Sequence, residues 1–363
     1  MRACPALRTF VAILLSCLSV RAFAAAPIEY HRIIGPEIKT GDYKHPSCFD
    51  QLDNGDLYLA YYGGAGEYAD ETKVYGLRLS GGSYADGNNW TAPQPIAQQP
   101  FLSLGNPVIW QAPDGILWFF YVTRYGDTWS SSRIAGKISR DHGHTWSDSF
   151  MVTFEEGTMV RGQPILLRNG DYLLPIYHET GADPEVTGAD STSRFLRKRV
   201  GSNTWEPSGI LASDKGNLQP AVAQIDDKRL VAFCRRAGDY EPTTRGWIVR
   251  GESNDGGFTW SRGVDTEFPN PNSAVDLKRL SNGHLLLVYN DSMVDRTPLT
   301  VAISTDGGQT FPHRRNIAEG PGAFAYPTAI QTKDQRIHIV YTSDNRTTIR
   351  HAILTEDAIT SPN

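Results

Sequence analysis

The chain has 363 residues, of which 40% are hydrophobic and 21% charged, and it carries a formal net charge of −5 at pH 7. This length and composition are typical of one large globular domain. The acidic balance argues against a basic surface for nucleic acid, and no segment after the N-terminus is long and apolar enough to span a membrane.

The first residues predict a secretory signal peptide. Arg2 and Arg8 give a basic start, Phe10–Val20 forms an apolar core, and small residues for cleavage follow. That core is too short to span a bilayer. We therefore expect residues 1–26 to be removed and residues 27–363 to form one exported domain, secreted or periplasmic.

Two cysteines, Cys48 and Cys234, remain after this cleavage. An oxidising compartment would allow them to pair. Both lie in apolar, strand-like stretches, where separate buried thiols are an equal alternative.

A loop signature of the form Ser-x-Asp-x-Gly-x-Thr-Trp recurs at nearly even spacing along the chain. Full copies lie at residues 139–146, 253–260 and 304–311, the last with Phe311 as its aromatic residue, and weaker copies lie at 86–90 and 201–205. In such a loop we expect the Asp and Gly to build a tight turn and the aromatic ring to pack between sheets. Regular repetition of this kind indicates an architecture of repeated units.

A second repeat consists of a turn followed by an apolar strand. The six turns begin at Asn54, Asp114, Asn169, Asp226, Asn282 and Asp334. Asn-Gly and Asp-Gly turns between apolar runs are strong hairpin signals, and runs such as 57–61 and 285–289 are rich in strand-forming residues. There is no convincing amphipathic helix.

Six units of this length predict an all-β fold, a six-bladed β-propeller of four-stranded sheets. The last unit offers only three strands, near Phe324–Gln331, Arg336–Thr342 and Thr348–Leu354. We expect Ile28–Ile34 to supply its outer strand, so that N- and C-terminal strands close the ring.

The loop signature resembles the Asp-box, or BNR repeat, of the sialidase (neuraminidase) superfamily, and the chain resembles the predicted neuraminidases of that superfamily over nearly its whole mature length. The resemblance implies recognition of a sugar carboxylate by three arginines, whose guanidinium groups offer paired donors. It places the second arginine at Arg235 or Arg236 and the third at Arg296.

The segment that matches the first arginine departs from the family pattern. It reads Tyr43-Lys44-His45-Pro46-Ser47, so Lys44 or His45 stands at that place. Lysine keeps the charge without the planar fork, and histidine is a switchable donor. The alternative is a solvated lysine beside a packed histidine.

The resemblance also implies catalytic groups. Asp70 matches the acid/base aspartate, with Glu67 nearby as a substitute, and Tyr326 matches the tyrosine nucleophile. A phenol needs a partner that removes its proton, yet Gln219 stands where the family carries a glutamate. Glu179 would have to replace that partner, or Tyr326 is a packed strand tyrosine and the chemistry differs.

Polar residues next to prolines stand at the start of the inner strands. In a propeller these strand ends of all blades meet at one opening of the central channel, called the mouth below. We expect a binding set formed by His45, Asn106, Arg161, Gln163, Gln219, Asn272 and Tyr326. The sequence has no Cys/His spacing for a metal and no glycine-rich phosphate loop, so we predict no cofactor.

Our leading hypothesis is an exported exo-glycosidase acting on a terminal acidic sugar of a glycan by retaining hydrolysis, with Tyr326 as nucleophile and Asp70 as acid/base. A first alternative is a lyase or glycosidase of uronic-acid polymers, in which Tyr326 or His178 moves a proton. A second is a non-catalytic glycan-binding propeller. A third, a protein-binding scaffold, agrees less well with polar residues on inner strands.

Overall fold

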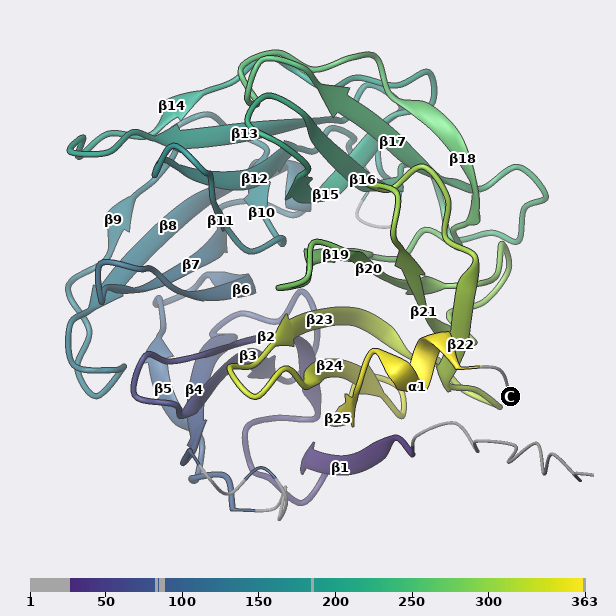
Figure 1. Ribbon diagram of the computed structural model, residues 1–363. Helices are drawn as coiled ribbons and strands as arrows, with labels where there is room; N and C mark the ends of the chain where they lie inside the picture. Colours follow the sequence, from purple (N-terminus) through teal and green to yellow (C-terminus); the bar gives the residue numbers. More distant parts are fainter. Residues whose placement is uncertain (1–26, 82–83, 85–88, 184–185, 362–363) are drawn as a thin grey trace, which may run out of the picture.

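A computed structural model describes residues 27–81, 84, 89–183 and 186–361. The expected signal peptide, residues 1–26, lies outside the described residues. Six antiparallel sheets are arranged around a central axis (Figure 1). The predicted all-β, six-bladed β-propeller is confirmed.

The first three blades follow one another along the chain. Blade 1 consists of β2 (Tyr43–Gln51), β3 (Leu57–Gly64), β4 (Lys73–Leu79) and β5 (Gln94–Ala97). Blade 2 consists of β6 (Ser103–Gln111), β7 (Leu117–Arg124), β8 (Ser132–Ser139) and β9 (Phe150–Met151), with the short 3-10 helix η1 (Trp129–Ser131) before β8. Blade 3 consists of β10 (Thr158–Val160), β11 (Ile165–Leu166), β12 (Tyr172–His178), β13 (Thr192–Lys198) and β14 (Glu206–Pro207).

The other three blades continue the pattern. Blade 4 consists of β15 (Asn217–Gln224), β16 (Leu230–Arg236), β17 (Trp247–Ser253) and β18 (Val264–Pro269). Blade 5 consists of β19 (Asp276–Arg279), β20 (Leu285–Asn290), β21 (Leu299–Ser304) and β22 (His313–Ala318). Blade 6 consists of β23 (Ala325–Gln331), β24 (Ile337–Ser343), β25 (Thr348–Leu354) and β1 (Glu29–Ile34), and α1 (Asp357–Thr360) follows β25.

The N-terminal strand closes the ring as expected. β1 pairs antiparallel with β25, with Glu29 opposite Ile353 and His31 opposite His351. β1 and β25 lie side by side in this blade (Figure 1). None of the helices in the described part of the chain is long and apolar enough to span a bilayer.

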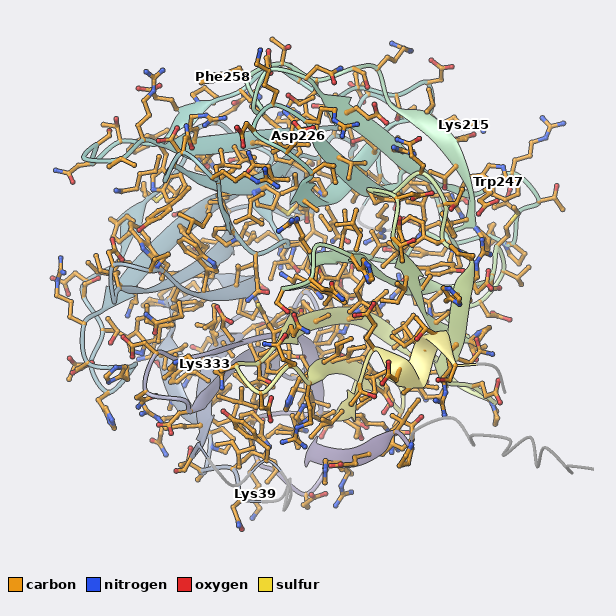
Figure 2. All side chains as sticks on the ribbon, viewed as in Figure 1. Lys39, Lys215, Asp226, Trp247, Phe258 and Lys333 are labelled. Atoms are coloured by element: carbon orange, nitrogen blue, oxygen red, sulfur yellow. The ribbon has the colours of Figure 1, made fainter. Side chains whose placement is uncertain are left out.

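The hydrophobic core lies between the blades. Five of the six large clusters of buried apolar residues combine strands of two neighbouring sheets. The sixth joins blades 2 and 3 and also includes Cys48 of blade 1 and Leu218 of blade 4. Charged side chains such as Lys39 and Lys215 lie at the outer edge of the disc (Figure 2). Because no blade has a core of its own, each sheet depends on its neighbours for burial of its two faces.

The aromatic residue of each repeated loop packs on the preceding blade. The ring of Trp146 lies 5.9 Å from that of Tyr58, Trp260 lies 4.0 Å from Phe195, and Phe311 lies 5.7 Å from Phe233. Trp205 packs in the same way against blade 2, and Trp90 against blade 6. The repeated loops therefore join blades around the ring.

Cys48 and Cys234 are both free and buried. They lie in separate blades, and each thiol contacts its own surroundings, Cys48 near Ile109 and Cys234 near Ser193. The structure therefore has two separate thiols.

Candidate active site

Bulges in the inner strands direct side chains toward the axis. Asn106, Gln219, Asn272 and Tyr326 all have positive φ, between 44° and 56°. Three of them lie where the pairing register of an inner strand shifts by one residue. Residues other than glycine rarely adopt this conformation, which costs about 1–3 kcal/mol per residue. Residues strained in this way cluster at functional sites.

These bulges line one pocket at the mouth of the ring. His45, Asn106, Gln219 and Tyr326 contribute from four different blades, and Arg235 reaches the pocket from β16. The remaining polar walls come from Glu67, Glu179, Tyr177, Tyr240, Trp129 and Thr187. The predicted convergence of arginine, tyrosine and amide side chains on one opening is therefore present.

Tyr326 is the centre of the hydrogen-bond network. Its hydroxyl accepts a hydrogen bond from Arg235 Nη1 at 2.7 Å and one from Gln219 Nε2 at 3.5 Å. Burial opposes ionisation of the phenol, but Arg235 and Arg296 outweigh it and hold the pKa of Tyr326 below its usual value. The site therefore favours the phenolate.

Arg235 is 2% exposed and uses its whole guanidinium. Nε donates to Asn272 Oδ1 at 2.6 Å, Nη1 also donates to Gln219 Oε1 at 3.1 Å, and Nη2 donates to the hydroxyl of Tyr240 at 3.1 Å. Burial disfavours its charge, but nearby Tyr326 offsets that cost and the pKa of Arg235 is raised. This guanidinium is fixed in place and permanently charged.

Two further arginines approach Tyr326. The guanidinium of Arg296 lies 5.5 Å from the ring centre of Tyr326, and its Nη2 donates to the carbonyl of Asn272 at 3.0 Å. Arg161 lies on another side of the ring, also at 5.5 Å, and donates to the backbone carbonyls of Tyr326 and Pro327. Arg161 therefore supports the backbone of the bulge.

His45 packs edge-on against Tyr326, with ring centres 4.2 Å apart. Its Nδ1 shares a 3.0 Å hydrogen bond with Thr342 Oγ1. Burial, reinforced by Arg346 and Arg296, holds the pKa of His45 well below its usual value. The imidazole is therefore neutral at physiological pH.

Two carboxylates line the pocket. Burial raises the pKa of Glu179 to about 7, against the opposing effect of Arg235. Glu67 accepts a hydrogen bond from the hydroxyl of Tyr43 at 2.8 Å and forms an ion pair with Arg346. Glu179 is thus able to exchange a proton near neutral pH, whereas Glu67 has a fixed cationic partner.

Four residues of the predicted site lie elsewhere. Asp70 is exposed in the β3–β4 loop and does not line the pocket. Lys44 donates to the carbonyl of Gly41 at 2.5 Å. Arg236 donates to the carbonyl of Asn270 at 2.9 Å, because neighbouring strand residues point to opposite faces.

Gln163 belongs to the opposite mouth of the ring. Its amide donates to the carbonyls of Phe49 and Ile109, and Lys278 donates to its side-chain oxygen at 2.7 Å. In blade 3 the pairing register shifts by two residues between β10 and β11, where the comparable blades shift by one. That larger bulge carries Gln163 away from the pocket.

Sequence reasoning missed Arg346, Tyr177, Trp129 and Tyr240. Tyr177 accepts a hydrogen bond from Asn106 at 3.0 Å, Trp129 comes from the 3-10 helix η1, and Arg346 and Tyr240 come from turns and loops. Their sequence context is unremarkable, since only the fold brings these turns to the mouth. No group of three His, Cys, Asp or Glu side chains in the described ranges is arranged to hold a metal ion.

Comparisons with known proteins agree with this architecture. The family model of the BNR repeat-like domain matches residues 55–339. No curated protein sequence matches the chain.

Solved structures give three examples of the same fold. A Hadza microbial sialidase has a TM-score of 0.75 at 16% identity, covering 91% of this chain and 69% of that chain. A protein of unknown function from Dyadobacter fermentans has a TM-score of 0.73 at 17% identity, covering 90% and 98%. The NanB sialidase of Streptococcus pneumoniae has a TM-score of 0.72 at 11% identity, covering 95% and 73%. At these identities the similarity shows the fold alone. The family match shows that this chain belongs to the BNR repeat-like domain family.

Proposed function

We propose that the protein is an exo-glycosidase that removes a terminal acidic sugar from a glycan, with retention at the anomeric carbon. One observation carries the proposal. The buried phenol of Tyr326, bonded to Arg235 at 2.7 Å, shares its pocket with Glu179, whose pKa is raised to about 7. The pKa of Tyr326 is lowered and that of Glu179 is raised, so both move toward neutral pH. Such a pair suits a nucleophile and a general acid.

The cations of the site favour an acidic sugar. Among the described residues, neither Arg235 nor Arg296 forms an ion pair with a carboxylate. Both face the ring of Tyr326, at 5.8 and 5.5 Å. A sugar carboxylate beside the phenol would neutralise them through charge-assisted hydrogen bonds.

Catalysis would take two steps. Tyr326 Oη attacks the anomeric carbon while the glycosidic C–O bond breaks and Glu179 gives its proton to the departing oxygen. Water then attacks the anomeric carbon, Glu179 accepts a proton from the water, and the electron pair of the broken bond returns to Tyr326. Arg235 stabilises the phenolate at the start and end. Because Asp70 is exposed outside the pocket, we assign the acid/base role to Glu179.

A lyase reaction on a uronic acid is the second candidate, favoured by the partners of Tyr326. Its hydroxyl contacts Arg235 and Gln219, neither of which accepts a proton. A phenolate base would take the proton from the carbon next to the uronate carboxylate. A carbon–carbon double bond then forms, the neighbouring C–O bond breaks, and Glu179 protonates the leaving oxygen.

We further propose that the protein is exported, because residues 1–26 have the sequence pattern of a signal peptide.

The experiment is a panel of fluorogenic glycosides of sialic, glucuronic and galacturonic acid, together with polyuronates followed by the absorbance of an unsaturated product. Fluorescence release supports hydrolysis, and new absorbance supports the lyase. Tyr326→Phe should lose activity by at least about a thousandfold, whereas Tyr61→Phe, which removes a hydroxyl bonded to Thr40, is the matched control. Binding of these sugars without any product would contradict both reactions and support a glycan-binding propeller.

A further inference from the structure

A second, more open groove adjoins the Tyr326 pocket. Tyr240 lines both, and the groove continues past Arg296 and Arg346 over the small side chains of Ala323 and Ala325. Its volume is about 410 Å³, which is within the range of ligand-binding pockets. None of the described residues that line it is acidic.

Arg346 is held rigidly at one wall of this groove. Its Nη1 donates to the hydroxyl of Tyr43 at 2.8 Å and forms an ion pair with Glu67. Asp344, Asn345 and Arg346 all have positive φ, between 52° and 65°, which fixes the turn that presents the side chain. The side chain of Arg346 is 32% exposed, so one edge of its guanidinium remains open to a ligand.

The groove carries uncompensated positive charge. Arg296 donates to a backbone carbonyl, and no ion pair joins it to a carboxylate among the described residues. Burial, together with the cations Arg235 and Arg346, lowers the pKa of Arg296, which reflects mutual repulsion of the guanidinium groups. A terminal sugar acid would neutralise part of this charge and leave Arg346 facing the next unit.

The groove also has a surface suited to a sugar ring. Tyr240 is 40% exposed, and the guanidinium groups of Arg235 and Arg296 lie 5.7 and 5.3 Å from its ring centre. These two contacts hold the Tyr240 ring between the pocket and the groove. The exposed part of the Tyr240 side chain can contact the sugar that follows the terminal unit, and the small side chains of Ala323 and Ala325 line the groove beside it.

We propose that this groove binds the second unit of the glycan, and that this unit carries its own carboxylate, which Arg346 and Arg296 recognise. The substrate is then an acidic sugar linked to another acidic sugar. This inference rests on the proposed function, because it takes the Tyr326 pocket as the place of the terminal unit.

The test uses pairs of disaccharides that share a terminal sialic or glucuronic acid and differ in the second unit, either galactose or galacturonic acid. We expect kcat/KM of the wild type to be roughly tenfold higher on the galacturonic acid member, the size of a charge-assisted contact. Arg346→Met should abolish this preference, so that both members are cleaved with equal kcat/KM. Arg350→Met is the control, since Arg350 lies on the same hairpin and pairs with Asp344 at 2.9 Å.

A second variant leaves the Glu67–Arg346 pair intact. Ala323→Asp adds a negative charge to the groove and should reverse the preference, whereas the neutral Ala323→Asn should keep it. Equal rates on both members in the wild type, or an equal loss on both members in Arg346→Met, would overturn the inference. If no disaccharide is cleaved, the proposed function has failed. The Kd values of the same disaccharides, measured by calorimetry, then test the inference. Tighter binding of the galacturonic acid member that is lost in Arg346→Met would support it, and equal binding of both members would overturn it.

Discussion

Tyr326 and Arg235 reach one another although they lie far apart in the chain, because the inner strand β23 bulges and β16 ends at the same mouth. The positive φ of Tyr326, 54°, turns the phenol into the pocket, and Arg161 holds the strained backbone through the carbonyl of Tyr326 at 2.8 Å. The strain is thus compensated by buried charge-assisted bonds. Arg235 and Arg296, on the side of the hydroxyl, lower the pKa of the phenol against the effect of burial.

Glu179 gives a prediction about pH. A general acid must be protonated, so kcat/KM should fall as pH rises through about 7, the raised pKa of Glu179. Glu179→Gln should lower kcat/KM about a hundredfold to ten-thousandfold and remove this fall at high pH. Glu206→Gln, an exposed residue paired with Arg199, is the control for the pH–rate measurement. An unchanged profile in Glu179→Gln would assign the proton to another group.

The residues of the site were predictable only in part. Arg235, Tyr326 and Gln219 follow from motif positions on strands, and strand alternation separates Arg235 from Arg236. Glu67 and Asp70 lie in the same loop, and its conformation decides which of the two carboxylates lines the pocket. No local sequence pattern specifies that conformation. Arg346 lies in a turn whose position at the mouth is a property of the closed ring.

At the scale of the element, the repeated loops are structural units. In one of them Asp255 accepts hydrogen bonds from Ser253 Oγ at 2.8 Å, from the Phe258 nitrogen at 3.0 Å, and from both the nitrogen and the hydroxyl of Thr259. The same bonds recur at Asp306, and Asp141 accepts those from its serine and threonine, Ser139 and Thr145. These carboxylates are occupied within their own turns.

Asp255→Ala should therefore destabilise the fold without altering the pocket. Loss of several hydrogen bonds to one carboxylate should lower the free energy of unfolding by about 1–3 kcal/mol, measured by urea denaturation. KM should stay at the wild-type value. Asp227→Asn, whose side chain is 85% exposed, should cost far less and is the control. A change in KM without a change in stability would show a direct part in binding.

The strand pairing that closes the ring contains a buried histidine cluster. Nδ1 of His338 lies 3.0 Å from Nε2 of His351, and the His31 ring of β1 lies 6.1 Å from that of His351. Burial lowers the pKa of His338 to about 4, with Arg336 adding to the effect and Asp334 opposing it. Burial also holds the pKa of His351 well below its usual value.

This cluster predicts acid sensitivity of ring closure. The unfolded chain binds protons at these histidines below their ordinary pKa of about 6.5, while the folded protein does not bind one at His338 until about pH 4. The free energy of unfolding should therefore decrease as the pH is lowered from about 6.5 to about 4, by roughly 3 kcal/mol from His338 alone. In urea titrations at a series of pH values, His338→Gln with His351→Gln should flatten this dependence. The exposed His144→Gln should leave it unchanged, and equal slopes in all three proteins would refute the account.

The elements themselves were largely predictable. Turn residues and apolar runs indicate six hairpin units, and the missing fourth strand of the last unit indicates the pairing of β1 with β25, which the structure has. The two-residue shift in blade 3, which carries Gln163 to the opposite mouth, was not predictable. Bulge size depends on packing against neighbouring strands, and sequence spacing alone does not record it.

At the scale of the whole molecule, function depends on closure. Side chains of five blades line the pocket, and packing between blades sets the distances among them. The lowered pKa of Tyr326 requires blades 4 and 6 together, since Arg235 of blade 4 touches Tyr326 of blade 6. The raised pKa of Glu179 comes from its burial in the assembled pocket, against the opposing effect of Arg235. The catalytic proposal is therefore a statement about the assembled ring.

Trapping of the covalent intermediate tests this proposal most directly. The protein would be incubated with a fluorinated analogue of whichever acidic sugar it releases, digested, and its peptides analysed by mass spectrometry. The account predicts one sugar adduct on the peptide that contains Tyr326, its absence in Tyr326→Phe, and its presence in Tyr61→Phe. An adduct on another residue, or turnover of the parent glycoside with inversion and no adduct, would contradict it.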